Sequence, residues 1–115
     1  MGTSLERGER VSESLLQEIT RRVVGAARPD RVILFGSAAT GEMTRDSDID
    51  LLVLEPSPGD IRAERLRIRS ALGDLGYPVD IVVMSTARFE ETKTVIGGIA
   101  YPANKYGKVI YETSR

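Results

Sequence analysis

The sequence predicts one small α/β domain in which helices pack against a single sheet. Short apolar runs rich in branched residues, typical of buried strands, alternate along the chain with longer segments whose apolar residues recur at helical spacing. The chain has 115 residues, enough for one hydrophobic core and too few for two. We therefore expect a single domain over residues 1–115, with residues 1–10 forming a flexible polar segment at the N-terminus.

The first half of the chain supplies a helix and a strand. An amphipathic helix is predicted at about residues 11–27, where Leu15, Ile19 and Val23 fall on one face. The run RVILF at residues 31–35 is predicted to be a short buried strand.

The second half repeats this alternation. The expected strands lie at residues 48–54, at residues 79–84 and, as a short edge strand, at residues 108–111. One expected helix covers residues 60–75, with Ile61, Ile68, Leu72 and Leu75 on one side and Gly76 as its end. Another helical region runs from Ser85 or Thr86 to about Tyr106, with breaks near Gly97-Gly98 and Pro102.

Composition removes several classes of site. The chain has no cysteine and no histidine, which excludes disulfides, thiolate and imidazole metal ligands, and a Ser-His-Asp triad. Any bound metal would have oxygen ligands, which favours Mg²⁺ or Mn²⁺ over zinc. The net charge of −1 argues against nucleic acid as a direct partner.

The sequence also predicts neither a signal peptide nor a membrane-spanning segment. The first ten residues are polar and lack the apolar segment of a signal peptide. No apolar run approaches the length needed to span a bilayer. We therefore expect a cytoplasmic protein with no membrane partner.

Two aspartates stand out on the strand predicted at residues 48–54. Asp48 and Asp50 are two positions apart, so their side chains project from the same face of the strand. Neighbouring carboxylates repel each other unless a positive charge lies between them, and a divalent cation is the natural solution. Ile49 and Leu51 point the other way, into the core, and so fix the register.

A third acid and a small-residue turn complete the pattern. Asp80 lies between Val79 and Ile81 at the start of another buried strand, where an ionised carboxylate needs an Arg, Lys or metal partner. Three carboxylates from neighbouring strands can hold two Mg²⁺ ions, the clamp used in phosphoryl and nucleotidyl transfer. Gly36-Ser37 follows a strand and precedes a helical turn, where free amides attract phosphate oxygens.

These residues together resemble the signature of the DNA-polymerase-beta-like nucleotidyltransferases. The run LFGSAATGEMTRDSDIDLLV, residues 34–53, matches the family's hydrophobic-Gly-Ser step and its later Asp-hydrophobic-Asp-hydrophobic motif. Asp80, flanked by apolar residues, matches the third acid. The resemblance implies an α/β fold with a mixed sheet of three to four strands and packed helices.

The resemblance also implies roles for individual residues. Asp48, Asp50 and Asp80 would be the catalytic metal ligands, and Gly36, Ser37 and Ser47 would contact the nucleotide's phosphates. The expected cofactors are two Mg²⁺ ions, for which Mn²⁺ can substitute, with ATP as the nucleotide substrate. Many relatives carry an arginine immediately before the glycine at which this chain has Thr40-Gly41, so any contact from that arginine is missing.

The short length and the ending ANKYGKVIYE resemble the minimal branch of this family. Members of that branch act as antitoxins of HEPN-domain toxins. The resemblance therefore implies transfer of a nucleoside monophosphate, AMP from ATP, to a hydroxyl on a toxin partner. The alternative is a catalytically silent binding module that neutralises its toxin partner by occlusion and retains the acids as a relic.

Two other interpretations of the acids fit less well. An EF-hand loop beginning at Asp46 would need glycine and glutamate where the chain has Leu51 and Ser57. A phosphoacceptor receiver domain would need an acidic pair where the first strand instead ends in Gly36-Ser37.

Overall fold

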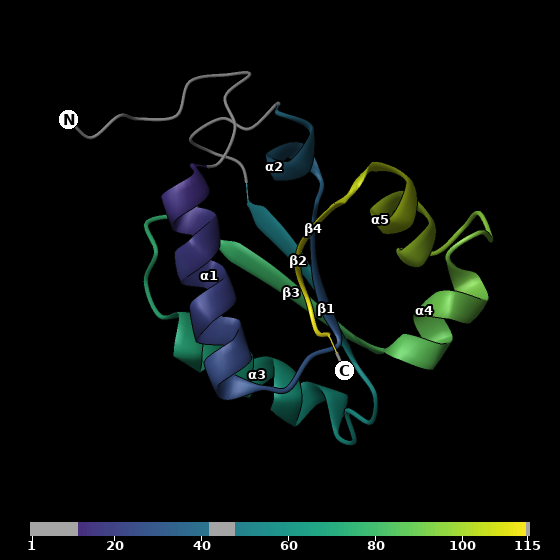
Figure 1. Cartoon of the computed structure of the whole chain (residues 1–115), viewed down its shortest axis with the longest axis horizontal. Coiled ribbons are helices and arrows are strands. Elements are labelled where there is room, and N and C mark those ends of the chain that lie inside the picture. Colours follow the sequence, from purple (N-terminus) through teal and green to yellow (C-terminus); the bar gives the residue numbers. More distant parts are fainter. Residues whose placement is uncertain (1–11, 42–47, 115) are drawn as a thin grey trace.

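A mixed four-stranded sheet organises the chain, with helices on both of its faces (Figure 1). The structure is a computed structural model that describes residues 12–41 and 48–114. The strands are β1 (Arg31–Phe35), β2 (Ile49–Glu55), β3 (Val79–Ser85) and β4 (Lys108–Glu112), in the spatial order β3-β2-β1-β4. The predicted mixed sheet and the predicted edge strand near the C-terminus are both confirmed.

The strand pairings set the geometry of the sheet. β1 runs antiparallel to both β2 and β4, and β2 runs parallel to β3. Parallel neighbours need a crossover, and the helix α3 (Ile61–Leu72) supplies it between β2 and β3. In this register Phe35 pairs with Asp50, and Asp50 pairs with Asp80. The acids predicted to act together are therefore neighbours at one end of the sheet.

Each face of the sheet has its own core. On one side, α1 (Glu13–Ala26) and α3 bury a stripe that includes Ile19, Val23 and Ile68. On the other side, α4 (Thr86–Thr92) and α5 (Ala100–Tyr106) bury Phe89, Ala100 and Ala103 against the sheet. The central strand β2 is apolar on both faces, as expected of a strand that helices cover twice. The remaining helix, α2 (Ser37–Thr40), is a single turn after β1.

The sequence misplaced two helix boundaries. α3 ends at Leu72, with Gly73 as its cap, and does not continue to Gly76. Gly73 has a positive φ of 61°, which glycine adopts more readily than other residues and which turns the chain out of the helix. In the helical region predicted to run to Tyr106, the break expected near Gly97-Gly98 is confirmed, because α4 and α5 are separate helices. The break expected near Pro102 is wrong, since Pro102 lies in the first turn of α5, where no amide donor is required.

Burial also differs from the periodicity at several positions. Ile61 is 37% exposed, whereas Glu64 of the same helix is buried. Glu55, which lies just outside the strand predicted at residues 48–54, is the last residue of β2 and is buried as well. Tyr106, a large aromatic residue at the end of α5, is 58% exposed. The proposed flexible segment at residues 1–10 lies outside the described residues.

No helix within residues 12–41 and 48–114 combines the length and the apolar character needed to cross a bilayer.

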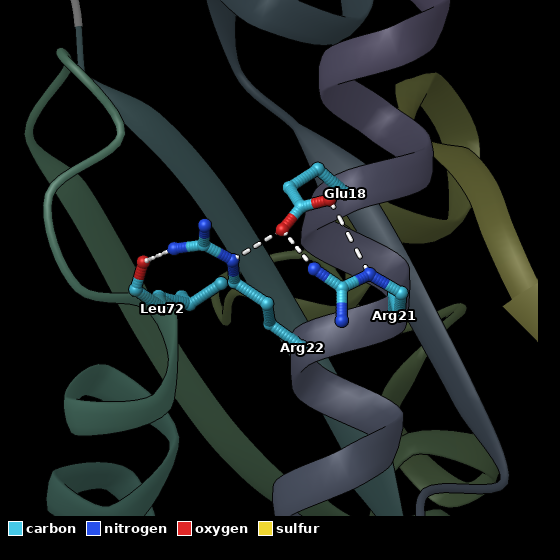
Figure 2. Close-up of polar contacts among 4 residues, drawn as sticks. All are labelled: Glu18, Arg21, Arg22 and Leu72. Carbon is cyan, nitrogen blue, oxygen red and sulfur yellow. Dashed lines mark hydrogen bonds and ion pairs between the residues drawn. The ribbon is translucent and has the colours of Figure 1, made fainter.

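An arginine joins the two helices that cover one face (Figure 2). The Arg22 guanidinium donates from Nε to Glu18 Oε2 at 2.6 Å and from Nη1 to the backbone carbonyl of Leu72. That carbonyl belongs to the last turn of α3, which has no helical amide left to pair with it. Hydrogen bonds from Arg22 and then Arg21 hold the pKa of the Glu18 carboxyl below its usual range. Arg22 therefore links α1 to the end of α3.

We expect Arg22→Met to lower the free energy of unfolding by about 1–2 kcal/mol, because it removes a charged donor from the Leu72 carbonyl and keeps most of the apolar stem. The matched control is Arg21→Met, since Glu18 is the only polar partner of Arg21 among the described residues and the Arg21 side chain is 70% exposed. Urea unfolding should show a smaller loss for the control. Equal losses for the two variants would contradict the role given to Arg22.

Candidate active site

Three predicted aspartates gather at one end of the sheet. Asp50 is the second residue of β2 and Asp80 the second residue of β3, and the two are direct partners in the parallel ladder. Parallel partners on adjacent strands lie about 4.8 Å apart along the hydrogen-bonding direction, and their side chains share a face. Asp48 comes immediately before β2 and is exposed, as is Asp80, whereas Asp50 is half-buried.

Gly36 lies directly against this acidic group. It follows β1, whose last residue Phe35 pairs with Asp50. A Cβ at Gly36 would lie 2.3 Å from Asp50 Oδ2, far inside van der Waals contact. The backbone also has a positive φ of 73° at this position. Both the conformation and the close approach to the carboxylate therefore require glycine.

The electrostatics of Asp50 reflect the same clustering. Burial is the main cause that raises the pKa of the Asp50 carboxyl above its ordinary value, and the negative charges of Asp80 and then Asp48 raise it further. A cation placed among the three acids would relieve this repulsion. The arrangement is therefore suited to positive charge.

The donor set fits a hard divalent ion, because three carboxylates supply the oxygen ligands that Mg²⁺ and Mn²⁺ prefer. In the described part of the chain, however, no three acidic side chains are yet oriented to ligate one ion. Asp48 and Asp80 are exposed, so they can change rotamer without losing packing. The fold thus brings the three aspartates together, but their side chains are not arranged to coordinate one metal ion.

The turn after β1 places backbone amides beside the acids. Gly36 precedes α2, and its carbonyl accepts from the amides of Ala39 at 3.1 Å and Thr40 at 3.3 Å. Ser37 is the first residue of the turn and is half-buried. The Thr40 hydroxyl lies 3.4 Å from the Ser37 carbonyl, so this side chain turns back on α2. The predicted contact residue Ser47 lies outside the described residues.

Sequence reasoning missed one residue next to the site. Arg69 falls at helical spacing from Arg62 and Arg65, a pattern typical of a solvated helix face. Its Nη1 instead donates to the backbone carbonyl of Val79 at 3.2 Å, one residue before Asp80. Helical spacing placed Arg69 correctly on α3 but held no signal for its contact with β3, which depends on how the crossover packs.

Comparison with known proteins gives a family match and several similar structures. The sequence profile of the nucleotidyltransferase domain matches residues 13–101, a range that includes Gly36 and all three aspartates. A toxin–antitoxin structure with AMP-PNP is 25% identical, with a TM-score of 0.61 over 86% of this chain and 74% of that chain. A search of curated proteins gives no match.

Two further structures share the fold at lower identity. A mutant MntA–HpeT toxin–antitoxin has 23% identity and a TM-score of 0.63, over 86% of this chain and 74% of that chain. A tri-AMPylated Shewanella oneidensis HEPN toxin in complex with its MNT antitoxin gives 22% identity and a TM-score of 0.56, over 88% of this chain and 72% of that chain.

We expect Asp80→Asn to leave the metal-free stability at pH 7 unchanged or to raise it by up to about 1 kcal/mol, because it removes a charge that repels Asp50. The pKa of Asp50 should fall toward its ordinary value, and any gain in stability should vanish at low pH, where the acids are protonated. NMR titration and urea unfolding measure the two effects. Glu91→Gln, on exposed α4 surface, is the control. A loss of several kcal/mol in Asp80→Asn would instead identify Asp80 as a structural ion-pair partner.

Proposed function

Because this chain belongs to the nucleotidyltransferase domain family, we propose that it transfers a nucleoside monophosphate from an NTP, with ATP as the donor, to a hydroxyl on a partner protein. The observation that carries this proposal is the placement of Asp50 beside Asp80, with Gly36 in contact, inside the matched region. A bond would form between the acceptor oxygen and the α-phosphorus, and the bond to the departing pyrophosphate would break.

Each acid has a distinct part in this proposal. Asp48 and Asp50 would hold both divalent ions, and Asp80 would hold the ion on the acceptor side. When bound, two Mg²⁺ ions, or Mn²⁺ in their place, supply positive charge that stabilises the attacking and leaving oxygens. Asp80, which is exposed at the sheet end, would also orient the acceptor hydroxyl and favour loss of its proton.

The turn after β1 would bind the triphosphate. Gly36 brings the main chain against Asp50 with no side chain in the way, so phosphate oxygens can approach the amides beside the acids. The Ser37 hydroxyl would add a donor, and Ser47 is proposed to add another. In relatives with arginine before the glycine, that side chain is a candidate for further contact, whereas Thr40 here turns back on the helix.

The proposed partner is a HEPN-domain toxin. Support comes from a structure of similar fold, which is described as a tri-AMPylated HEPN toxin in complex with its MNT antitoxin. The structure that is 25% identical to this chain is a toxin–antitoxin with AMP-PNP, an ATP analogue. The acceptor would then be a hydroxyl on the toxin, and this chain would be the antitoxin, acting in the cytoplasm.

Metal and nucleotide together should stabilise the folded protein. A non-hydrolysable ATP analogue with Mn²⁺ or Mg²⁺ should raise the melting temperature, because the ligands bind the folded state and not the unfolded chain. Asp50→Asn should abolish this increment and remain folded, whereas Glu91→Gln should keep it. If the wild-type protein shows no increment, the proposed metal and nucleotide site is wrong.

Mass spectrometry of the toxin partner separates catalysis from occlusion. With ATP and Mg²⁺, the wild-type chain should add one or more AMP units to the copurified toxin, which should stay inactive after separation. The Asp48→Asn/Asp50→Asn double mutant should still bind the toxin but leave its mass unchanged, because it lacks the charge that stabilises the transferring phosphoryl group. Full protection of cells by the double mutant would identify the chain as an occluding binding module.

A further inference from the structure

A polar hollow lies at the opposite end of β2 from the aspartates. Asp50 and Glu55 are five residues apart on this strand, which at roughly 3.3 Å per residue separates them by about 17 Å. The hollow has a volume of about 610 Å³ and lies between the C-terminal end of α1, the end of β2 and α3. The residues that matter to its chemistry are Gly25, Ala26, Arg28, Glu55, Glu64 and Arg67.

Glu55 is a buried acid that lacks a positive partner of its own. It is 6% exposed, and its Oε2 has no hydrogen-bond partner among the described residues. The nearest ionisable group is Glu64 of α3, which is 7% exposed and pairs with Arg67. The single arginine is thus shared between two carboxylates. A buried carboxylate oxygen without a donor is unfavourable, so a donor bound from solution would be favoured at Glu55 Oε2.

The end of α1 adds further acceptors to the same hollow. The helix ends at Ala26, and no basic residue lies in its last turn. The Val23 carbonyl accepts from the Ala27 amide, but in the described residues no donor is recorded for the carbonyls of Gly25 and Ala26, which line the hollow. Unpaired carbonyls at a helix C-terminus carry partial negative charge and favour cations.

We infer that this hollow binds an ammonium group, held by the Glu55 carboxylate and the free carbonyls at the end of α1. An ammonium has three donors and no acceptor, which matches Glu55 Oε2 and the two carbonyls at the end of α1, for which no donor is found among the described residues. A metal ion fits less well, because the only acidic side chains among the described lining residues are Glu55 and Glu64 and the hollow is larger than an ion needs. The site is separate from the proposed catalytic site and does not depend on its activity.

Two kinds of ligand carry an ammonium group, a simple alkylamine and an amino acid. They differ in whether a carboxylate would also lie beside Arg28 at the edge of the hollow. Arg28 lines the hollow, is exposed and has no ion-pair partner among the described residues. A simple alkylamine would leave Arg28 unused, whereas an amino acid with a separated carboxylate would reach it as well. The shared chemistry is the ammonium at Glu55, and Arg28 would distinguish the two.

Binding should depend on pH with a defined sign. Burial, followed by the hydrogen bond and the negative charge of Glu64, raises the pKa of Glu55 to about 7, with Arg67 opposing the shift. An alkylammonium keeps its proton up to about pH 10. Only the ionised Glu55 attracts it, so affinity should rise as the pH increases from 6 to 8. The other charged groups facing the hollow are Glu64 and Arg67 from α3 and Arg28 after α1.

The test is an NMR titration of the full chain with butylamine at pH 6 and pH 8, with 1-butanol as the neutral control. Butylamine should shift the amides of Gly25 and Ala26, more strongly at pH 8, and 1-butanol should not. Glu55→Gln, of the same size, should weaken binding about tenfold or more at pH 8. Glu91→Gln should bind like the wild type.

Titration with 4-aminobutyrate tests Arg28. Tighter binding than that of butylamine, lost in Arg28→Gln, identifies an amino-acid ligand. Equal binding of the two compounds identifies a simple amine.

Two results would overturn the inference. One is the absence of butylamine shifts at Gly25 and Ala26 in the wild type at pH 8. The other is binding that is the same in Glu55→Gln, or the same at pH 6 and pH 8. In either case Glu55 and Glu64 would be a structural pair of acids that shares a proton, and the hollow would not be an ammonium site.

Discussion

The register in which β2 and β3 pair is the constraint on which the candidate active site depends. Asp50 and Asp80 are direct partners in this parallel ladder, and Ile49 pairs with Val79 beside them. A slip by one residue would turn Asp50 toward the core of α1 and α3 and bring apolar residues to the site. Leu51 and Val53 oppose such a slip, because both are fully buried on the face that α1 and α3 cover. Apolar packing therefore holds the two like charges together against their repulsion.

The antiparallel pairing of β1 with β2 adds the second element of the site. It places Phe35 opposite Asp50, so the residue that follows must pass the carboxylate at close range. Position 36 therefore requires glycine, since a Cβ there would overlap Asp50 Oδ2. The turn that can bind phosphate and the acids that can bind metal are therefore coupled through a single backbone contact.

The acids at the two ends of β2 differ in how deeply they are buried. Near its start, Asp48 and Asp80 are exposed and Asp50 is half-buried, so water screens much of their charge and a metal ion can enter. At its end, Glu55 is buried with Glu64 between two helices, where charge is poorly screened. The same residue chemistry therefore gives an accessible cluster of acids at one end of the strand and a buried, poorly screened pair of acids at the other.

The sequence by itself determined the strands and the choice of candidate site residues, whose roles are a proposal. Apolar runs placed β1 without error, and β2 and β3 to within one residue, because strand burial is a local property of residue type. The spacing of Asp48, Asp50 and Asp80 indicated that they would gather, since strand alternation fixes the face on which each side chain projects. Gly36 was identified from its position, although not from its contact with Asp50.

Only the tertiary structure decided features that depend on contacts between distant segments. Glu55 was left outside the predicted strand and Ile61 was assigned to a buried face, because neither residue type nor spacing shows how α3 rotates as it crosses over the sheet. The early end of that helix at Gly73 accompanies a hydrogen bond from Arg22, which is 50 residues away in the chain. The packing of the helices on the sheet decides which aspartates are exposed, how deeply Glu55 is buried and where the hollow beside it forms. Local sequence does not determine that packing.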